Sequence, residues 1–178
     1  TKWQKCRYPA ELQHKIEVIH EGIDTDTVKP NSNAWVEING QRLQAGDEIV
    51  TYVARDLEPY RGFHTFIRSL PKLQALRPDA KVIIVGGDDV SYGLHLPEGQ
   101  TYRQRYCAEV QDQIDWSRIF FVGKLPYADY LKVLQVSAAH VYLTYPFVLS
   151  WSMLEAMAAG CLLVASDTAP VRELIEDG

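Results

Sequence analysis

The chain has 178 residues, of which 47% are hydrophobic and 23% are charged, a composition typical of one globular domain with its own core. A formal net charge of −5 gives no electrostatic footprint for nucleic acid. No apolar run approaches the roughly 20 residues that a membrane-spanning helix needs, and the first residues lack the apolar stretch of a signal peptide. The three cysteines are scattered without a CxxC pair, so we expect reduced thiols in the cytoplasm and no zinc site.

Residues 1–48 form a leading segment in which the predicted elements are short. Pro9 is expected to open a short helix, and the β-branched run over residues 16–20 predicts a strand. A polar loop rich in turn formers follows it. Asn39-Gly40 and Gly46-Asp47 each indicate a turn, so a hairpin is expected around them.

From residue 49 to residue 178, apolar runs of strand length alternate with helical patterns. The run over residues 49–54 is continuous, as expected of a strand that is buried on both faces. In the first helical pattern Pro71 predicts a kink or a break. This alternation predicts an α/β fold, a Rossmann-like parallel sheet with helices on both faces and right-handed crossovers. Strands are expected over residues 49–54, 81–87, 118–123, 140–144 and 161–166, and helices over residues 62–77, 98–113, 127–138, 152–159 and 170–176.

Ligands of such sheets bind at the carboxyl ends of the strands, where three loops carry candidate residues. In the first loop Arg55 and Arg61 flank a turn and could face one anion, because the arginine fork donates two hydrogen bonds to phosphate. Gly62 would open the next helix, whose amide dipole also favours an anion. The alternative, which the residue types alone favour, is two surface arginines paired with Asp56 and Glu58.

The second loop contains Gly86 and Gly87, which let the backbone turn sharply and approach a ligand closely. Asp88 and Asp89 follow them and could hold a metal or hydroxyl groups, although such a pair is more often solvated turn chemistry. The pattern is not GxGxxG, so the fingerprint of a nicotinamide dinucleotide site is absent.

Two other patterns of metal-binding residue types are interpreted as structural. The DTD sequence over residues 24–26 resembles a metal motif of some sugar transferases, but it precedes the predicted sheet and is better explained as a turn. The five histidines show no metal-ligand spacing, and His140, which begins a buried strand, is interpreted as a core histidine with its hydrogen bonds satisfied. The HExxH, GxSxG and Walker A motifs are absent.

The third loop leads to Glu155, the single carboxylate in the apolar and small stretch over residues 145–160. Ser152 and Glu155 have the spacing of a capping box, in which Glu155 would satisfy an amide at the start of its own helix. Alternatively, Glu155 reaches into the cleft and accepts both hydroxyls of a ribose, because a carboxylate is an acceptor-only group with two oxygens. The free amides around Ser150, Trp151 and Ser152 would then face a phosphate. Periodicity does not separate these interpretations.

Taken in order, these stretches resemble the retaining glycosyltransferases of family 4, also called group 1. A strand is followed by ARDLEPYRGF, the next strand ends in VGGDD, and then come FFVGKLPYADYLKVL and SMLEAMAAGCLLVASDTAPVRELIEDG. The stretch KIEVIHEGIDTDTVKP looks like the approach to the second domain of that family. The resemblance covers nearly the whole chain and rests on the order and spacing of all the pieces.

The resemblance implies a GT-B fold, in which two Rossmann-like domains hold the active site between them. Residues 49–178 would be the carboxyl-terminal domain that binds the nucleotide sugar. The amino-terminal, acceptor-binding domain and the final helices of the family would be missing, so we expect the isolated chain to bind donor weakly and to transfer little. The implied partners are the donor, an acceptor saccharide or other hydroxyl compound, and the missing domain. The resemblance is also compatible with peripheral contact of that domain with the inner face of the membrane.

Position by position, the resemblance also implies roles for individual residues. Arg55 matches the arginine that neutralises the donor diphosphate, and Arg61 stands where the family usually has a lysine with the same task. Glu155 matches the second glutamate of a paired motif, the one that binds the donor ribose. The other implied donor contacts are the turn and helix start at Gly62 and Gly87, the base-framing residues Val122, Gly123, Lys124 and Leu125, and the residues beside the sugar and phosphates, Phe147, Ser150, Trp151 and Ser152.

The implied reaction is the retaining transfer of a sugar from a nucleoside diphosphate of the UDP, GDP or ADP type to a hydroxyl group. It requires no cofactor and no metal if Arg55, Arg61 and helix amides stabilise the leaving diphosphate. One position departs from the family, because Phe147 stands where the first glutamate of the paired motif contacts the donor sugar. Ser150 or backbone amides would have to replace that contact. Two alternatives therefore stay open, a nucleotide-sugar epimerase of GT-B fold and a non-catalytic sugar-nucleotide-binding domain.

Overall fold

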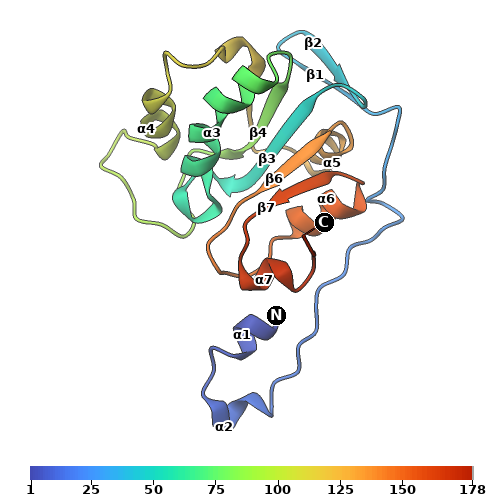
Figure 1. Cartoon of the computed structure of the whole chain (residues 1–178), viewed down its shortest axis with the longest axis vertical. Helices are drawn as coiled ribbons and strands as arrows, with labels where there is room; N and C mark the ends of the chain where they lie inside the picture. Colours follow the sequence, from blue (N-terminus) through green and yellow to red (C-terminus); the bar gives the residue numbers. More distant parts are fainter. Residues whose placement is uncertain (178) are drawn as a thin grey trace.

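Five parallel strands form the central sheet of the computed structural model, which describes residues 1–177. They lie in the order β5-β4-β3-β6-β7, so the chain begins in the middle, moves outward to β5, and returns to the other side of β3 (Figure 1). The predicted α/β class is confirmed. The strands are β3 (Ile49–Asp56), β4 (Lys81–Gly87), β5 (Ile119–Gly123), β6 (Ala139–Tyr142) and β7 (Leu162–Ala165).

Helices cover both faces of the sheet (Figure 1). On one face Phe66 of α3 packs in a core with Ile84 of β4, and on the other face Val133 of α5 packs in a core with Ile83. Ile83 and Ile84 serve different cores because successive side chains of a strand point to opposite faces. The helical elements are η1 (Pro59–Arg61), α3 (Phe63–Leu76), α4 (Tyr102–Glu109), η2 (Trp116–Arg118), α5 (Tyr127–Gln135), α6 (Trp151–Ala158) and α7 (Ala169–Arg172).

An antiparallel hairpin of β1 (Trp35–Ile38) and β2 (Gln41–Gln44) packs on the same face of the sheet as α5. Its turn is Asn39-Gly40, whose two residues have positive φ values of 52° and 75°. Positive φ at both central residues is the type I′ geometry that favours this dipeptide. The expected hairpin is therefore confirmed, with its turn at the first of the two predicted positions.

The leading segment contains two short helices, α1 (Lys2–Lys5) and α2 (Ala10–Gln13), that lie below the body of the protein in Figure 1. The short helix expected after Pro9 is confirmed. The strand predicted over residues 16–20 is wrong, because these residues form no regular element. Residues 16–20 pair with no strand of either sheet. A β-branched run becomes a strand only where another strand forms hydrogen bonds with it.

Glu173, which directly follows α7, joins the leading segment to the body. Its carboxylate accepts hydrogen bonds from the backbone N–H groups of Lys2 and Trp3, both at 2.7 Å, and His20 Nε2 lies 3.7 Å from it. Burial raises the pKa of Glu173, but the two amide hydrogen bonds outweigh this effect and place the pKa below its usual value. The first turn of α1 is thus fixed against the end of α7.

Several helices differ from their predictions. Helix α4 (Tyr102–Glu109) is shorter than the predicted range of residues 98–113, and α5 ends at Gln135 and not at residue 138. Helix α7 has Pro170 in its first turn, as expected, but ends already at Arg172.

Helix α3 runs through Pro71, so of the predicted kink or break the structure excludes the break. The N–H of Arg77 donates to the carbonyl of Leu73 at 2.8 Å, which shows that helical hydrogen bonding resumes after the proline. Four buried residues of α3 that precede Pro71, together with Leu73 after it, hold the helix on the sheet across the missing hydrogen bond.

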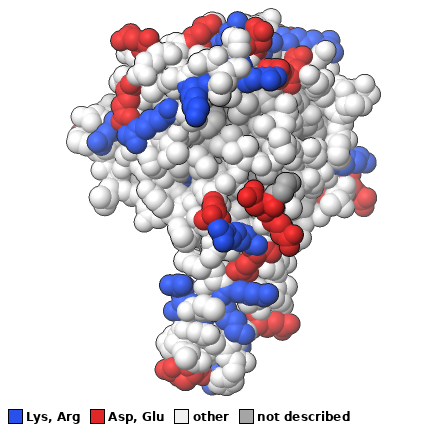
Figure 2. Space-filling model, viewed as in Figure 1, with Lys and Arg blue, Asp and Glu red and all other residues white. Residues whose placement is uncertain are grey.

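Charged side chains of both signs are interspersed on the face shown in Figure 2. The same view shows the extended leading segment, which also carries charges of both signs. Among the helices of residues 1–177, none has the length and apolar character needed to span a bilayer.

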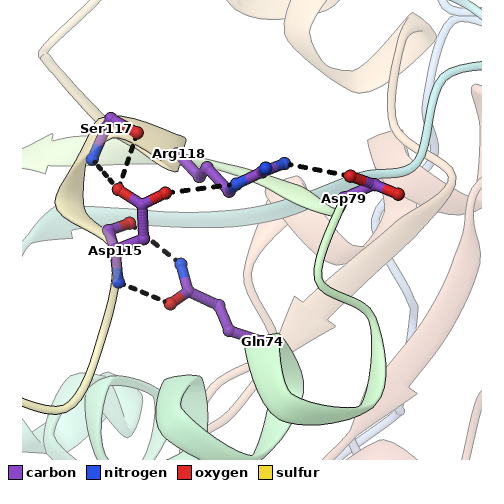
Figure 3. A network of polar contacts seen from close by, with 5 residues as sticks. All are labelled: Gln74, Asp79, Asp115, Ser117 and Arg118. Carbon is purple, nitrogen blue, oxygen red and sulfur yellow. Dashed lines mark hydrogen bonds and ion pairs between the residues drawn. The ribbon is translucent and has the colours of Figure 1, made fainter.

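A polar network joins the amino ends of β4 and β5 (Figure 3). Asp115 accepts hydrogen bonds from the N–H of Ser117 at 2.9 Å and from its hydroxyl at 2.6 Å. Gln74 exchanges two hydrogen bonds with the backbone of Asp115, at 2.8 and 3.0 Å. Arg118 lies between two carboxylates, 3.3 Å from Asp115 and 3.5 Å from Asp79. The positive charge in this network is therefore balanced within the protein.

Candidate functional site

The carboxyl ends of β3 and β6 lie side by side at the point where the strand order reverses. Doubly wound sheets bind ligands in the crevice outside such a point. The loops after the two strands touch there, because the N–H of Tyr145 donates to the carbonyl of Tyr60 at 3.2 Å. Gly62 has a φ of +70°, and a Cβ on it would lie 2.3 Å from Leu143 Cβ, so this approach requires glycine. The first and third candidate loops thus come together.

Arg61 extends its guanidinium from the end of η1 to the loop after β6. Its Nη1 donates to Tyr142 Oη at 3.2 Å, to Thr144 Oγ1 at 3.2 Å and to the carbonyl of Val148 at 3.3 Å. All three acceptors are neutral, and no ion pair within residues 1–177 involves Arg61. A cation that is held in place without a carboxylate is preorganised for an anionic ligand.

Four aromatic rings cluster at the Arg61 side chain. The guanidinium lies over the rings of Phe147 and Tyr92, at 5.4 and 5.7 Å from their centroids. Those two rings meet edge to face at 5.1 Å, and Tyr60 contacts both of them as well as Tyr145. Cation–π contacts of this kind fix the guanidinium further. Phe147 therefore lies beside the predicted phosphate-binding group.

The Glu58 carboxylate binds the loop after β4 and does not pair with an arginine. Its side chain is 1% exposed and accepts hydrogen bonds from the N–H groups of Tyr92 at 3.0 Å and Gly93 at 2.7 Å. These bonds position the Tyr92 ring at the guanidinium of Arg61. The interpretation in which the acids of the first loop neutralise Arg55 and Arg61 is therefore wrong, because this buried carboxylate is satisfied by backbone amides.

Asp56 pairs with Lys124, which reaches it from the end of β5 across β4. Lys124 Nζ lies 2.8 Å from Asp56 Oδ1, and the hydroxyl of Ser91 donates to Oδ2. The lysine passes over Gly87, where a Cβ would lie 2.4 Å from Lys124 Cε. Burial raises the pKa of Asp56, but the hydrogen bonds of Lys124 and Ser91 outweigh it and hold the pKa below its usual value. The charge of Lys124, a residue predicted to frame the base, is thus compensated.

Glu155 is 6% exposed and accepts two hydrogen bonds from tyrosines of α5. Tyr127 Oη lies 2.8 Å from Oε1, and Tyr130 Oη lies 2.6 Å from Oε2. Sequence reasoning missed both tyrosines. Their spacing of three residues after Pro126, on one face of a predicted helix, is the signal that could have indicated them.

Helix α6 begins at Trp151, with Ser150 as its N-cap. Ser152 lies inside the helix and its N–H donates to the hydroxyl oxygen of Ser150 at 3.3 Å, so the predicted capping box is wrong. The N–H of Ser150 donates at 3.0 Å to Tyr142 Oη, the same oxygen that accepts from Arg61. One hydroxyl therefore connects Arg61 to the start of α6. The prediction of free amides at this helix start is wrong for Ser150 and Ser152, whose N–H groups have partners within the protein.

The residues predicted to frame the base, Val122 to Leu125, lie at the end of β5. Val122 and Leu125 line a cleft of about 680 Å³ that extends between the hairpin and α5. This volume is in the range of small-molecule sites. The polar and aromatic part of the lining comes from Asn31, Asn33, Trp35, Glu37, Asn39, Phe121, Asp129 and Lys132.

Arg55 is exposed at the end of β3, and its side chain forms no hydrogen bond or ion pair with another described residue. It shares none of the contacts that fix Arg61. The structure thus gives the two predicted phosphate-binding arginines different surroundings, one fixed in the crevice and one exposed to solvent.

The acidic pairs singled out in the sequence form turns and surface contacts. Asp24 accepts hydrogen bonds from the hydroxyl of Thr27 at 2.7 Å and from the N–H of Asp26 at 3.0 Å, which is the expected turn. Asp88 pairs with Arg103 at 3.2 Å. No group of three or more His, Cys, Asp or Glu residues in the part of the chain that the structure describes could hold a metal ion.

His140 is fully buried, as predicted, with Nδ1 2.8 Å from the hydroxyl of Thr51. Burial lowers the pKa of His140 to about 4, so the ring is neutral near pH 7. The expectation that both nitrogens are satisfied is wrong, because Nε2 has no hydrogen-bond partner among the described residues.

A doubly wound parallel sheet with polar and charged side chains at its point of reversal is the architecture of nucleotide-binding α/β domains. The sequence matches the family model "Glycosyl transferases group 1" over residues 34–178 and the model "Glycosyl transferase family 4 group" over residues 1–28. The chain therefore belongs to the group 1 glycosyl transferases, in agreement with the resemblance in its motifs.

Curated relatives point to the same family. D-inositol 3-phosphate glycosyltransferases of Mycobacterium sp. (strains KMS and JLS) are 25% identical to this chain over 165 residues. The match covers 92% of this chain and 34% of each relative. The chain thus spans about a third of the length of the curated relatives it matches.

Solved structures share the fold at low sequence identity. A point mutant of S. aureus TarM, solved in complex with fondaparinux, alpha-GlcNAc-glycerol and UDP, has a TM-score of 0.65 at 17% identity, over 99% of this chain and 31% of that one. The carboxyl-terminal domain of a group 1 family glycosyl transferase (LpcC) from Francisella tularensis has a TM-score of 0.64 at 17% identity, over 88% and 76%. The fold is that of a carboxyl-terminal GT-B lobe.

Proposed function

We propose that this chain is the donor-binding domain of a retaining glycosyltransferase, which moves a sugar from a nucleoside diphosphate sugar to a hydroxyl of an acceptor. The observation that carries the proposal is the Arg61 guanidinium, fixed at the strand reversal by three neutral oxygens and lacking a carboxylate partner among the described residues. A diphosphate supplies the missing negative charge. The names of the mycobacterial relatives, and the UDP in the TarM structure, support this choice of ligand.

The bound donor would extend along the carboxyl edge of the sheet. Its diphosphate would contact Arg61 and the N–H of Trp151, for which no hydrogen-bond partner is found among the described residues, with the exposed Arg55 as a second cation. Its ribose would meet Glu155, and its base would lie near Val122 and Leu125. When the bond between the anomeric carbon and the diphosphate oxygen breaks, the electron pair stays on the diphosphate. Arg61 would stabilise the charge that develops there.

A second candidate is a domain that binds nucleotide sugars without catalysis. The Phe147 ring lies over the Arg61 guanidinium, where the family resemblance led us to expect an acid at the donor sugar. An aromatic ring offers no hydrogen-bond acceptor for the sugar hydroxyls. This candidate predicts binding of the same nucleotides without transfer of the sugar.

Calorimetric titration with UDP, GDP and ADP tests the binding site. We expect at least one of them to bind, and Arg61→Ala and Glu155→Ala each to weaken that binding by about 1–3 kcal/mol, as is typical for the loss of a hydrogen bond to a charged group. Arg55→Ala should have a smaller effect, because the Arg55 side chain is exposed. Arg77→Ala serves as the control, since Arg77 pairs with Glu48 on the surface. Unchanged affinity in both Arg61→Ala and Glu155→Ala would refute the site.

Donor turnover separates the two candidates. Incubation of the protein with nucleotide sugars and hydroxyl acceptors, followed by NMR of the product, reports whether a sugar is transferred and whether its anomeric configuration is retained. Transfer with retention supports the glycosyltransferase. Binding without transfer by a full-length form of the protein supports the non-catalytic domain.

A further inference from the structure

The Glu155 carboxylate has one tyrosine hydroxyl on each oxygen, and the two tyrosines differ in their surroundings. Tyr127 is the first residue of α5 and is 53% exposed. Tyr130, one turn later, is partly buried and packs in the hydrophobic cluster that contains Leu134 and Ala156. Tyr130 is therefore fixed by its neighbours, whereas Tyr127 has solvent beside it.

This arrangement leaves little room at the carboxylate for a ligand. Glu155 is 6% exposed, and each of its oxygens already accepts a hydrogen bond, at 2.8 Å from Tyr127 and at 2.6 Å from Tyr130. A buried carboxylate oxygen without a donor is costly, so the two hydroxyls stabilise the protein while no ligand is bound. Each oxygen could accept a second hydrogen bond, but the carboxylate is covered by its neighbours, so a ligand that donates to it gains access by moving one hydroxyl aside. Of the two tyrosines, only Tyr127 has solvent into which its side chain can move.

We propose that Tyr130 is a positioning residue that fixes the Glu155 carboxylate, and that Tyr127 occupies in the free protein the place of one ligand hydroxyl. This inference rests on the proposed function, because the ligand is a nucleotide whose ribose carries both hydroxyls. On binding, one ribose hydroxyl donates to Oε1 in place of Tyr127, and the Tyr127 hydroxyl turns to water. Tyr130 remains bonded to Oε2 and keeps the carboxylate oriented.

The exchange has opposite consequences for the two tyrosines. Without the Tyr127 hydroxyl, Oε1 has no donor until the ribose arrives, so the nucleotide satisfies a group that was unsatisfied before. Binding should then become tighter. Without the Tyr130 hydroxyl, Oε2 loses its donor in the free and the bound state, and the carboxylate can rotate away from the ribose. Binding should then become weaker, as long as the ligand has ribose hydroxyls.

The test compares Tyr127→Phe and Tyr130→Phe with the wild type and with Tyr8→Phe, a control whose ring is 56% exposed in the leading segment. UDP, GDP and ADP are titrated first, and the nucleotide that binds most tightly is then compared with its 2′,3′-dideoxy counterpart. We expect Tyr127→Phe to tighten binding of the ribonucleotide about fivefold and Tyr130→Phe to weaken it about tenfold. Neither should alter the affinity for the dideoxy nucleotide, and Tyr8→Phe should alter nothing.

The outcomes distinguish this inference from the proposed function. If the wild type prefers the ribonucleotide and both variants keep the same preference, the inference fails and the proposed function stands. If the wild type binds both nucleotides equally well, Glu155 does not contact the ribose and the inference fails, whereas the proposed function fails only if no nucleotide binds or if binding is also independent of Arg61. An equal loss of affinity for ribo and dideoxy forms in Tyr130→Phe would indicate a purely structural role and would overturn the positioning role. Thermal unfolding confirms beforehand that each variant is folded.

Discussion

Two arginines lie at opposite ends of the same sheet, and their surroundings differ. Arg118, at the amino end of β5, lies between Asp115 and Asp79, and both its partners are carboxylates (Figure 3). Arg61, at the carboxyl end of β3, contacts three neutral oxygens and two aromatic rings. Both side chains are held by several contacts, so rigidity does not distinguish them.

The difference lies in charge balance. A structural arginine is neutralised by the protein itself, as Arg118 is. An arginine that is fixed by neutral groups retains its full positive field, which a ligand can then neutralise. The buried acids nearest to Arg61 in the sequence, Asp56 and Glu58, are directed to Lys124 and to backbone amides instead. The carboxyl edge of the sheet thereby keeps Arg61 as a fixed cation without a carboxylate partner among the described residues, whereas Arg118 at the amino edge is balanced by two carboxylates.

The largest effect is expected from breaking the contact between the two loops at the carboxyl edge. Gly62→Ala would put a Cβ 2.3 Å from Leu143 Cβ at a φ of +70°. Steric overlap and backbone strain together should lower the free energy of unfolding by about 3 kcal/mol, measured by urea denaturation. Gly99→Ala is the matched control, because its φ is +79° but no atom lies within 4 Å of the added Cβ. It should cost only about 1 kcal/mol of strain. Equal losses in the two variants would mean that the loops do not touch as described.

The second prediction compares the removal of Arg61 with the removal of Arg118. Arg61→Ala should weaken binding of a nucleoside diphosphate about tenfold or more, because the charge it removes faces the ligand. Arg118→Ala should leave that affinity unchanged and lower the free energy of unfolding by about 1 kcal/mol, since its ion pairs are partly exposed. Calorimetry and urea denaturation on both variants provide the four values. An Arg118→Ala variant with impaired binding would contradict the assignment of the site to the carboxyl edge.

The smallest effect is expected in the pH dependence of stability, from Asp56 at the carboxyl edge and Asp115 at the amino edge. The pKa of Asp56 lies below its usual value of 3.8 in the folded protein, so its ionised form favours folding. That contribution is complete above about pH 4 and is lost as the pH falls through the lowered pKa. Urea denaturation between pH 5 and pH 2 should show a shallower loss of stability for Asp56→Asn than for the wild type.

Asp115 at the amino edge provides the comparison. The hydroxyl and amide of Ser117 lower its pKa as well, but its side chain is 54% exposed and solvent screens its interactions. Asp115→Asn should therefore change the acid dependence of stability less than Asp56→Asn. A larger change for Asp115→Asn would contradict the expectation that the buried Asp56 contributes more to stability than the exposed Asp115.

Local sequence predicted the strands of the sheet well, because each is an apolar run whose length and flanking turns indicate a strand without knowledge of its partner. The same reasoning failed at residues 16–20, where a β-branched run lacks a neighbouring strand. It was also wrong to allow a break at Pro71, where burial of the face of α3 outweighs one missing hydrogen bond. Both errors arise because tertiary contacts override a local preference.

The site was less predictable than the fold. Arg61, Gly62 and Glu155 were named from their residue types, their order and a family resemblance, and their roles stay predictions. Their partners were not predicted, because Tyr130 and Tyr127 lie 25 and 28 residues from Glu155 and meet it only after α5 and α6 have packed on the sheet. Residue types also suggested arginine–acid pairs in the first loop, and only the fold shows that backbone amides and Lys124 satisfy those acids.

The hydroxyl of Tyr142 accepts hydrogen bonds from Arg61 at 3.2 Å and from the N–H of Ser150 at 3.0 Å. An oxygen that accepts two hydrogen bonds couples its two donors, because a shift of one donor changes the bond to the other. An anion that pulls the guanidinium toward itself would loosen its bond to this oxygen and free the oxygen to hold the first turn of α6 more firmly. Because Glu155 lies on that helix, a phosphate bound at Arg61 would strengthen the contact between Glu155 and the ribose. A nucleoside without phosphates would then lose more affinity than its missing phosphate contacts alone predict.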